Sequence, residues 1–234
     1  MIPWVQLGKA PVPGGGEVRL MRRDAEFSIR LGVKELMNSR LSGSEEALAT
    51  LACARIRHRA RPRVLIGGLG MGFTLRAALG ALAADAQIAV AELIPAVAQW
   101  AENEMAEIFA GSLRDPRVRV ELTDVAELIG AYGATYDAIL LDVDNGPEGF
   151  TRSANDRLYD ARGLAKARAA LTPGGVLAVW SSGPDRKFTQ RLRDAGFATE
   201  EVATRARGAR GGARHVIWIA TRPADERKSG RPTR

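Results

Sequence analysis

The sequence predicts an α/β fold, a doubly wound, mainly parallel, Rossmann-like sheet that binds its ligand along one edge. Residues 63–72 read RVLIGGLGMG, an apolar strand that ends in a run of glycines. Strand-like and helix-like segments alternate after this turn, which is typical of right-handed βαβ units. Three successive strands end on or just before a carboxylate, at Glu92, Asp124 and Asp142. Ligands of such sheets bind beyond the carboxyl ends of the strands, so these acids mark the predicted site.

The glycine turn narrows the choice of ligand. Gly68, Gly70 and Gly72 let the backbone turn sharply and approach a nucleotide closely. The spacing is GxGxG, so Phe73 stands where the GxGxxG fingerprint of nicotinamide enzymes needs a glycine. No GK[ST] follows, as a phosphate loop would require. An S-adenosyl nucleotide fits this turn, because it has no pyrophosphate to place at a helix N-terminus.

The other elements follow from hydrophobic periodicity. Helices are expected from Phe73 and over residues 95–109, 124–130 and 158–171. Strands are expected over residues 87–93, 117–122, 136–142, 174–182, 197–204 and 215–222. These elements give a nucleotide-binding domain over residues 46–221 and a polar, disordered tail over residues 222–234.

Residues 1–45 form a small β element that precedes this domain, with strands at 17–23 and 25–32. A helix is expected over residues 42–60, where Ser42 or Ser44 with acids behind it gives a capping signal. Glu45 and Glu46 either cap this helix or line the pocket. Both alternatives remain open at this point.

Each strand-end carboxylate has a structural alternative to a ligand role. Glu92 lies roughly 20 residues beyond the glycine turn, where an acid can accept both ribose hydroxyls; it could instead cap the helix that starts at Pro95. Asp124 opens a helical stretch and is either an N-cap or a ligand to the nucleotide. Asp142 ends an uncharged strand and leads into a loop that contains Asp144. Asp142 is therefore the catalytic candidate.

Composition favours one main domain of ordinary core size, since 46% of the 234 residues are hydrophobic. Cys53 is alone, and His58 and His215 have no metal-ligand spacing, so we expect no metal site and structural roles for both histidines. The start lacks the apolar core of a secretory signal and no segment is apolar enough to span a membrane. We therefore expect a cytoplasmic protein with no membrane partner.

The net charge of +7 raises nucleic-acid binding as an alternative class. Four arginines cluster between the last two predicted strands, at Arg205, Arg207, Arg210 and Arg214. A solvated hairpin loop explains this cluster better, because aromatic content is only 6% and no aromatic residues alternate with the basic ones. Nucleic acid is not an expected partner.

These segments resemble the spermidine synthase-like aminopropyltransferases, which share the class I S-adenosylmethionine methyltransferase fold. The resemblance runs from about residue 32 to 221. PRVLIGGLGMGFTLRAAL is similar to the family's nucleotide turn, VAELIPAV and DPRVRVELTDVAEL to its two acidic motifs, and YDAILLDVDNGPEGF to its catalytic strand and gate loop. LGVKELMNSRLSGSEEAL is similar to the segment through which substrate reaches the site.

The resemblance implies that Glu92 holds the ribose, Asp124 the adenine, and Asp142 the amine that attacks the carbon next to the sulfonium sulfur. It implies Glu45, Glu46 and Asp144 as acceptor-binding candidates, and a homodimer as a possible assembly. Two departures concern the substrate. Gly70 replaces an Asp of true spermidine synthases, and Ser44 and Glu45 replace the usual Tyr-Gln or Tyr-His. The Asp would repel a carboxylate, so its absence favours ordinary S-adenosylmethionine as well as the decarboxylated form.

The sequence therefore predicts a transferase that passes an alkyl group from S-adenosylmethionine, or its decarboxylated form, to a small amine-type acceptor. Methyl transfer is slightly preferred on account of Gly70. True aminopropyl transfer is the first alternative, and a nucleotide-binding protein without catalysis is the second.

Overall fold

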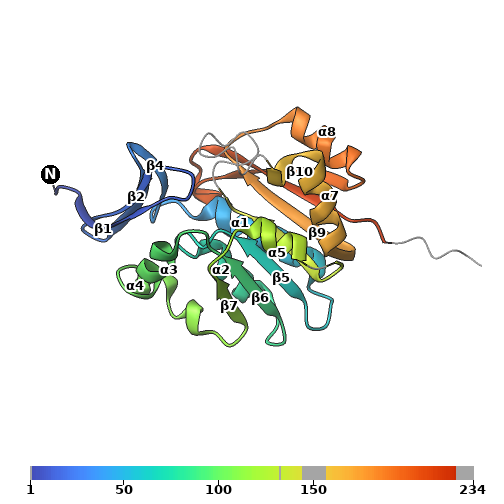
Figure 1. The fold of residues 1–234 in the computed structure, drawn as a ribbon, viewed down its shortest axis with the longest axis horizontal. Coiled ribbons are helices and arrows are strands. Elements are labelled where there is room, and N and C mark those ends of the chain that lie inside the picture. The colour runs from blue at the N-terminus through green and yellow to red at the C-terminus, as the bar shows by residue number, and fades with distance from the viewer. Residues whose placement is uncertain (1, 132, 144–156, 225–234) are drawn as a thin grey trace, which may run out of the picture.

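The computed structural model describes residues 2–131, 133–143 and 157–224. The chain folds into two separate sheets with helices packed around the larger one (Figure 1). The larger has seven strands in the order β10-β11-β9-β8-β5-β6-β7. Its strands are β5 (Arg63–Gly67), β6 (Gln87–Ala91), β7 (Val118–Glu121), β8 (Tyr136–Leu141), β9 (Leu171–Ser181), β10 (Ala198–Arg205) and β11 (Arg214–Thr221).

The five strands β5 to β9 run parallel, and β10 and β11 form an antiparallel hairpin added beside β9. The strand order reverses between β5 and β8, because β6 and β7 lie on one side of β5 while β8 and β9 lie on the other. Ligands of doubly wound sheets bind at such a reversal. The predicted α/β fold with a mainly parallel sheet is confirmed.

Helices cover both faces of this sheet because alternate strand residues point to opposite sides. One face packs beneath α1 (Gly43–Ile56), α2 (Phe73–Ala81) and α3 (Pro95–Glu102), through strand residues such as Val64 and Ile66. The other face packs beneath α5 (Val125–Ala131), α7 (Ala161–Ala170) and α8 (Arg186–Asp194), through residues such as Leu65. No helix in the described part of the chain is long and apolar enough to cross a membrane.

The smaller sheet contains four antiparallel strands in sequential order. They are β1 (Val5–Pro11), β2 (Glu17–Arg23), β3 (Glu26–Leu31) and β4 (Lys34–Asn38). Its apolar residues Val18, Leu20 and Ile29 are buried and join the core beneath α1 to α3. The sequence indicated the two middle strands, β2 and β3. It did not indicate β1 and β4, because their side chains are mostly exposed or half-buried.

Two local predictions need correction. The helix expected over residues 95–109 is two helices, α3 and α4 (Ala106–Phe109), separated at Asn103, whose N–H closes α3 on the Gln99 carbonyl. Ser42 stands at the start of α1 without donating or accepting a capping side-chain bond, so the expected cap is not formed. The Ser44 hydroxyl donates instead to the Glu45 carboxylate, at 2.6 Å.

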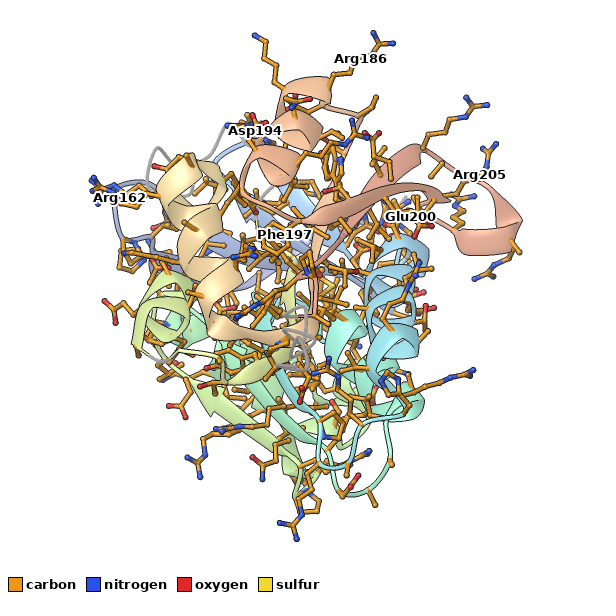
Figure 2. All side chains as sticks on the ribbon, turned by 90° about the vertical axis from the view of Figure 1, so that its right-hand side faces the viewer. Arg162, Arg186, Asp194, Phe197, Glu200 and Arg205 are labelled. Carbon is orange, nitrogen blue, oxygen red and sulfur yellow. The ribbon has the colours of Figure 1, made fainter. Side chains whose placement is uncertain are left out.

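The last strands form a hairpin that carries the arginine-rich loop, as expected. Short 3₁₀ turns occur at η1 (Ser112–Arg114) and, in this loop, at η2 (Gly208–Arg210). The loop docks on the start of α1, where the Gly43 N–H donates to the Ala206 carbonyl at 3.0 Å. Arg205 projects away from the body of the molecule in Figure 2 and is exposed. Beyond the hairpin, the Arg222 guanidinium donates to the Leu171 carbonyl at 2.6 Å, which ties the first tail residue to the sheet.

Candidate active site

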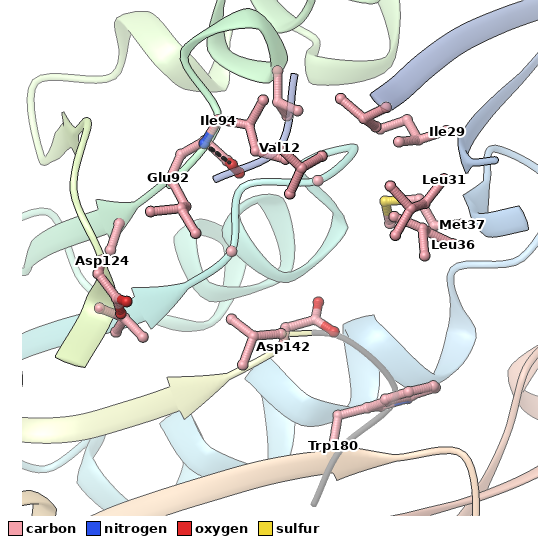
Figure 3. A pocket seen from close by; sticks show the side chains of 18 of the residues that line it. Val12, Ile29, Leu31, Leu36, Met37, Glu92, Ile94, Asp124, Asp142 and Trp180 are labelled. Carbon is pink, nitrogen blue, oxygen red and sulfur yellow. Dashed lines mark hydrogen bonds between the residues drawn. The ribbon is translucent and has the colours of Figure 1, made fainter. Parts of the chain in front are cut away.

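One pocket opens where the carboxyl ends of β5, β6 and β8 meet the small N-terminal sheet. Part of this pocket is open to solvent, and residues of both sheets and of α1 line it. Figure 3 shows Glu92 and Asp124 toward one end, Asp142 and Trp180 beside the centre, and Ile29, Leu31 and Met37 at the other end. The N-terminal sheet thus supplies an apolar wall to a site whose acidic groups come from α1 and from the ends of strands of the large sheet.

The glycine turn brings backbone to this pocket at two of the three predicted positions. Gly68 and Gly70 line the pocket and have φ values of +91° and +51°. A Cβ at Gly68 would lie 2.5 Å from the Asp142 carbonyl oxygen, so no side chain fits between β5 and β8. A Cβ at Gly70 would lie 2.7 Å from the Met37 sulfur. Met37 therefore fills the space that the absence of a side chain at position 70 leaves.

Gly72 is not among the described residues that line the pocket. Its φ is +75°, it precedes the first residue of α2, and a Cβ there would lie 2.5 Å from the Phe109 ring. The structure therefore gives Gly72 a role in starting the helix. Nucleotide binding by Gly72 stays a prediction that the pocket lining does not favour.

Glu92 is 7% exposed, and its carboxylate accepts hydrogen bonds from two backbone amides. Its Oε2 accepts from the Leu69 N–H in the glycine turn at 3.0 Å, and its Oε1 from the Ile94 N–H before α3 at 2.8 Å, the bond drawn in Figure 3. Burial raises the pKa of Glu92, while these amides oppose the shift. Glu92 therefore holds the backbone just before α3 and also lines the pocket, and its contact with a ribose stays a prediction.

Asp124 likewise combines two positions. Its Oδ1 accepts from the Ala126 N–H at 2.9 Å, which caps α5. The residue also lines the pocket at the end formed by Ala91 to Ile94, next to Thr123 and Val125. The cap is confirmed, and the adenine contact stays a prediction.

Asp142 follows β8 directly, and its N–H continues the ladder to the Gly67 carbonyl at 3.0 Å. Its Oδ2 accepts from the Thr74 hydroxyl of α2 at 2.7 Å. Burial raises the pKa of Asp142 to about 6, and the Thr74 bond opposes this shift. Thr74 is itself buried, so it holds the carboxylate in one orientation within the pocket.

Glu45 of α1 is the second acid at this place. It lines the pocket, and its pKa rises to about 7, first through burial and second through the negative charge of Asp142. Two carboxylates in one partly buried site share protons more readily than two exposed ones. Glu46, by contrast, is exposed and does not line the pocket, while Asp144 lies outside the described residues.

The charge of the pocket has one sign. Glu45, Glu92, Asp124 and Asp142 line it, and no lysine, arginine or histidine does so in the part of the chain that the structure describes. The described residues contain no cluster of three or more side chains able to hold a metal ion. The site therefore suits cationic small molecules.

Sequence reasoning missed the residues that support these acids. Thr74 lies in the helix after the glycine turn, and Ser44 lies beside Glu45 where it was read as a cap. His215, read as structural, places its Nδ1 2.9 Å from the Ser44 hydroxyl. No signal in the sequence links His215 with Ser44, because 171 positions separate them.

The comparisons with solved structures agree with this fold. Spermidine synthase from Thermotoga maritima matches with a TM-score of 0.74 and 18% identity, over 97% of this chain and 76% of that one. A spermidine synthase in complex with the transition state analogue AdoDATO gives a TM-score of 0.72 at 18% identity over the same shares. A probable spermidine synthase from Corynebacterium glutamicum gives 0.64 at 14% identity, over 93% of this chain and 79% of that one. The fold is that of the spermidine synthases, the class I methyltransferase-like fold expected from the sequence.

The sequence relatives are named polyamine aminopropyltransferases. The polyamine aminopropyltransferase of Mycobacterium tuberculosis is 31% identical over 144 residues, which are 58% of this chain and 27% of the relative. That of Synechococcus sp. is 28% identical over 126 residues, 52% of this chain and 38% of the relative. No family model matches the chain. The resemblance to the spermidine synthase-like family is confirmed, and the chain spans about a quarter to two fifths of the length of these curated relatives.

The expected preference for methyl transfer finds no support. Both sets of relatives are named for aminopropyl transfer or spermidine synthesis. The preference rested on the absence of an acid at Gly70, and four other carboxylates line the pocket: Glu45, Glu92, Asp124 and Asp142. The alternative of aminopropyl transfer fits these findings better.

Proposed function

We propose that this protein transfers an aminopropyl group from decarboxylated S-adenosylmethionine to a small amine. The observation that carries the proposal is the charge of the pocket, where four carboxylates and no basic side chain occur in the described lining. The decarboxylated donor carries a sulfonium and an ammonium group and no carboxylate. The fully carboxylated donor would bring its negative charge toward Glu45 and Asp142 without a cationic partner, which costs free energy in a partly buried site.

The nucleoside would lie at the end of the pocket formed by Glu92 and Asp124. The Glu92 carboxylate is held in the pocket wall by the Leu69 and Ile94 amides, in a position to meet a ribose hydroxyl. Asp124 lines the same pocket as Ala91 and Val125, which offer apolar contact to an adenine ring. These placements support roles for Glu92 in holding the ribose and for Asp124 in receiving the adenine amino group.

The chemical step needs a neutral amine in line with the carbon beside the sulfonium sulfur. The amine lone pair forms the new C–N bond while the C–S bond breaks, and the bonding pair stays on sulfur as a thioether. Overall, one proton leaves the acceptor. Asp142 and Glu45 are placed to orient the acceptor and to accept that proton, because their pKa values of about 6 and about 7 leave them ionised at slightly alkaline pH and ready to take a proton.

Product analysis tests this proposal. The protein is incubated with putrescine and either donor, and products are separated by mass spectrometry. We expect spermidine and methylthioadenosine from the decarboxylated donor. Appearance of methylated putrescine and S-adenosylhomocysteine from S-adenosylmethionine would restore the methyl-transfer alternative, and absence of any product with several amines would support a protein without catalysis.

A further inference from the structure

Behind the pocket wall, Glu45 is connected to a histidine that the proposed reaction has not used. The Ser44 hydroxyl donates to Glu45 Oε2 at 2.6 Å, and His215 Nδ1 lies 2.9 Å from the same hydroxyl. Ser44 is completely buried, while His215 of β11 is half-buried. The three side chains thus form a continuous hydrogen-bonded path from the pocket to the flank of the β10–β11 hairpin.

The position of His215 is fixed by its surroundings. Its ring packs edge-on against Trp180 of β9, with centroids 4.8 Å apart and planes at 70°. Trp180 itself lines the pocket, so the histidine stands directly behind the wall. Burial lowers the pKa of His215, which keeps the imidazole neutral at neutral pH and favours release of any proton that the ring takes up.

We infer that Glu45, Ser44 and His215 form the path by which the proton lost from the acceptor amine leaves the site. This inference rests on the proposed function and assigns residues to one of its steps. Glu45 touches the pocket and takes the proton there. His215 acts through Ser44 and Glu45, and is therefore a positioning residue rather than a catalytic one.

Two proton shifts along these hydrogen bonds move one proton from Glu45 to His215. When Glu45 holds the proton, its O–H donates to the Ser44 oxygen, and the serine hydroxyl donates to the unprotonated Nδ1 of neutral His215. The shift of both protons along these bonds leaves Glu45 ionised and His215 as imidazolium, and the serine hydroxyl then donates to Glu45 as the structure shows. The half-exposed imidazolium loses a proton to solvent, and proton exchange between the ring nitrogens and solvent restores the neutral ring with Nδ1 unprotonated, so that Glu45 and His215 are ready for another acceptor.

Charged groups around His215 do not interrupt this path. The helix α1 contributes Glu45 and the exposed Glu46, and β9 contributes none. On β10, Glu200 pairs with Arg55 and Glu201 accepts from Thr189. The remaining charges belong to four exposed arginines, Arg205, Arg207, Arg210 and Arg214. Their positive charge favours release of a proton from the imidazolium.

The test uses His215→Phe, which keeps an aromatic ring against Trp180 and removes both nitrogens, together with Ser44→Ala. The matched control is His58→Phe, since His58 is exposed and is the only other histidine. We expect His215→Phe to lower kcat at least about tenfold, short of the roughly 100- to 10,000-fold cost of losing a general base, with KM for the donor unchanged. His215→Ala should regain kcat when imidazole is added. An unchanged kcat in His215→Phe, or a loss that imidazole does not restore, would overturn the path.

A second measurement does not depend on turnover. The two histidines give separate ring signals in NMR, and Glu45→Gln should change the titration of His215 and leave that of His58 as it was. An unchanged His215 signal in this variant would contradict the connection. If the wild-type protein transfers nothing from either donor, the proposed function fails while the NMR result still decides whether the three side chains are coupled.

Discussion

Asp142 is the residue on which the proposed chemistry depends most. It is held by the Thr74 hydroxyl, it lies beside Glu45, and it lines the pocket between the nucleoside end and the apolar wall. Asp142→Asn keeps the shape and the bond to Thr74 but cannot take a proton. We expect turnover to fall by about 100-fold or more, with donor affinity nearly unchanged. Steady-state kinetics and calorimetry on the same preparation measure both; normal turnover would remove Asp142 from the reaction.

The paired acids also predict a pH dependence of stability. Their pKa values in the folded protein, about 7 for Glu45 and about 6 for Asp142, lie above the ordinary values of 4.5 and 3.8. At pH values between the ordinary pKa and the raised pKa of each acid, the folded state binds more protons than the unfolded state. The stabilising contribution present below about pH 4 is therefore lost as pH rises to about 7.

The double substitution Glu45→Gln and Asp142→Asn replaces both acids by amides that do not titrate, so it removes the loss of stability that these acids cause as pH rises. Relative to wild type, the double variant should gain free energy of unfolding between pH 5 and pH 8, by roughly 1 to 3 kcal/mol. Urea denaturation at pH 5 and pH 8 measures the difference. A constant difference at both pH values would show that the acids do not carry raised pKa values.

At the scale of elements, the glycine turn has two separate tasks. Gly68 and Gly70 bring backbone to the wall of the pocket, and Gly72 lets α2 begin against Phe109. Gly72→Ala adds a methyl group 2.5 Å from the Phe109 ring at a φ of +75°. We expect a loss of about 2 kcal/mol or more in the free energy of unfolding.

Gly80→Ala in the same helix is the matched control, because nothing lies within 4 Å of its added Cβ and its φ is not positive. We expect this variant to be as stable as wild type or up to about 1 kcal/mol more stable. Chemical denaturation of the two variants compares them directly. Equal stabilities would mean that Phe109 moves aside without cost.

The sequence predicted these elements well where each carries its own pattern. The alternation of strand-like and helix-like segments from Val64 to Ala220 placed every strand of the large sheet. The parallel strands β5 and β8 were the clearest, because buried parallel strands are continuous hydrophobic runs. It failed where the decisive contact is distant. The break between α3 and α4 and the exposed strands β1 and β4 follow from packing, not from a local pattern.

The same limit applies to the site. Glu92, Asp124 and Asp142 could be found because each follows a strand, and the edge of a parallel sheet gathers such residues. Two features could not be found from the sequence: the apolar wall from the N-terminal sheet and the contact of Ser44 with His215. Both depend on how separate parts of the chain pack together. The contact of Met37 with the backbone at Gly70 belongs to the same group.

At the scale of the whole molecule, positive and negative charge are separated. The net charge of +7 is carried by side chains outside the pocket, such as the exposed Arg186 and Arg205 that project from the surface in Figure 2. The pocket has only acids in its described lining. A basic protein therefore presents an acidic site, and the overall charge says little about its ligand.

Calorimetric titration with the two donors, under the same buffer and salt, tests this charge separation and with it the proposed reaction. Decarboxylated S-adenosylmethionine should bind at least about tenfold more tightly than S-adenosylmethionine, a difference of about 1.4 kcal/mol, because only the latter brings a carboxylate to Glu45 and Asp142. The difference should shrink in Asp142→Asn combined with Glu45→Gln. Equal affinities in the wild-type protein, or tighter binding of S-adenosylmethionine, would contradict aminopropyl transfer as the function of this site.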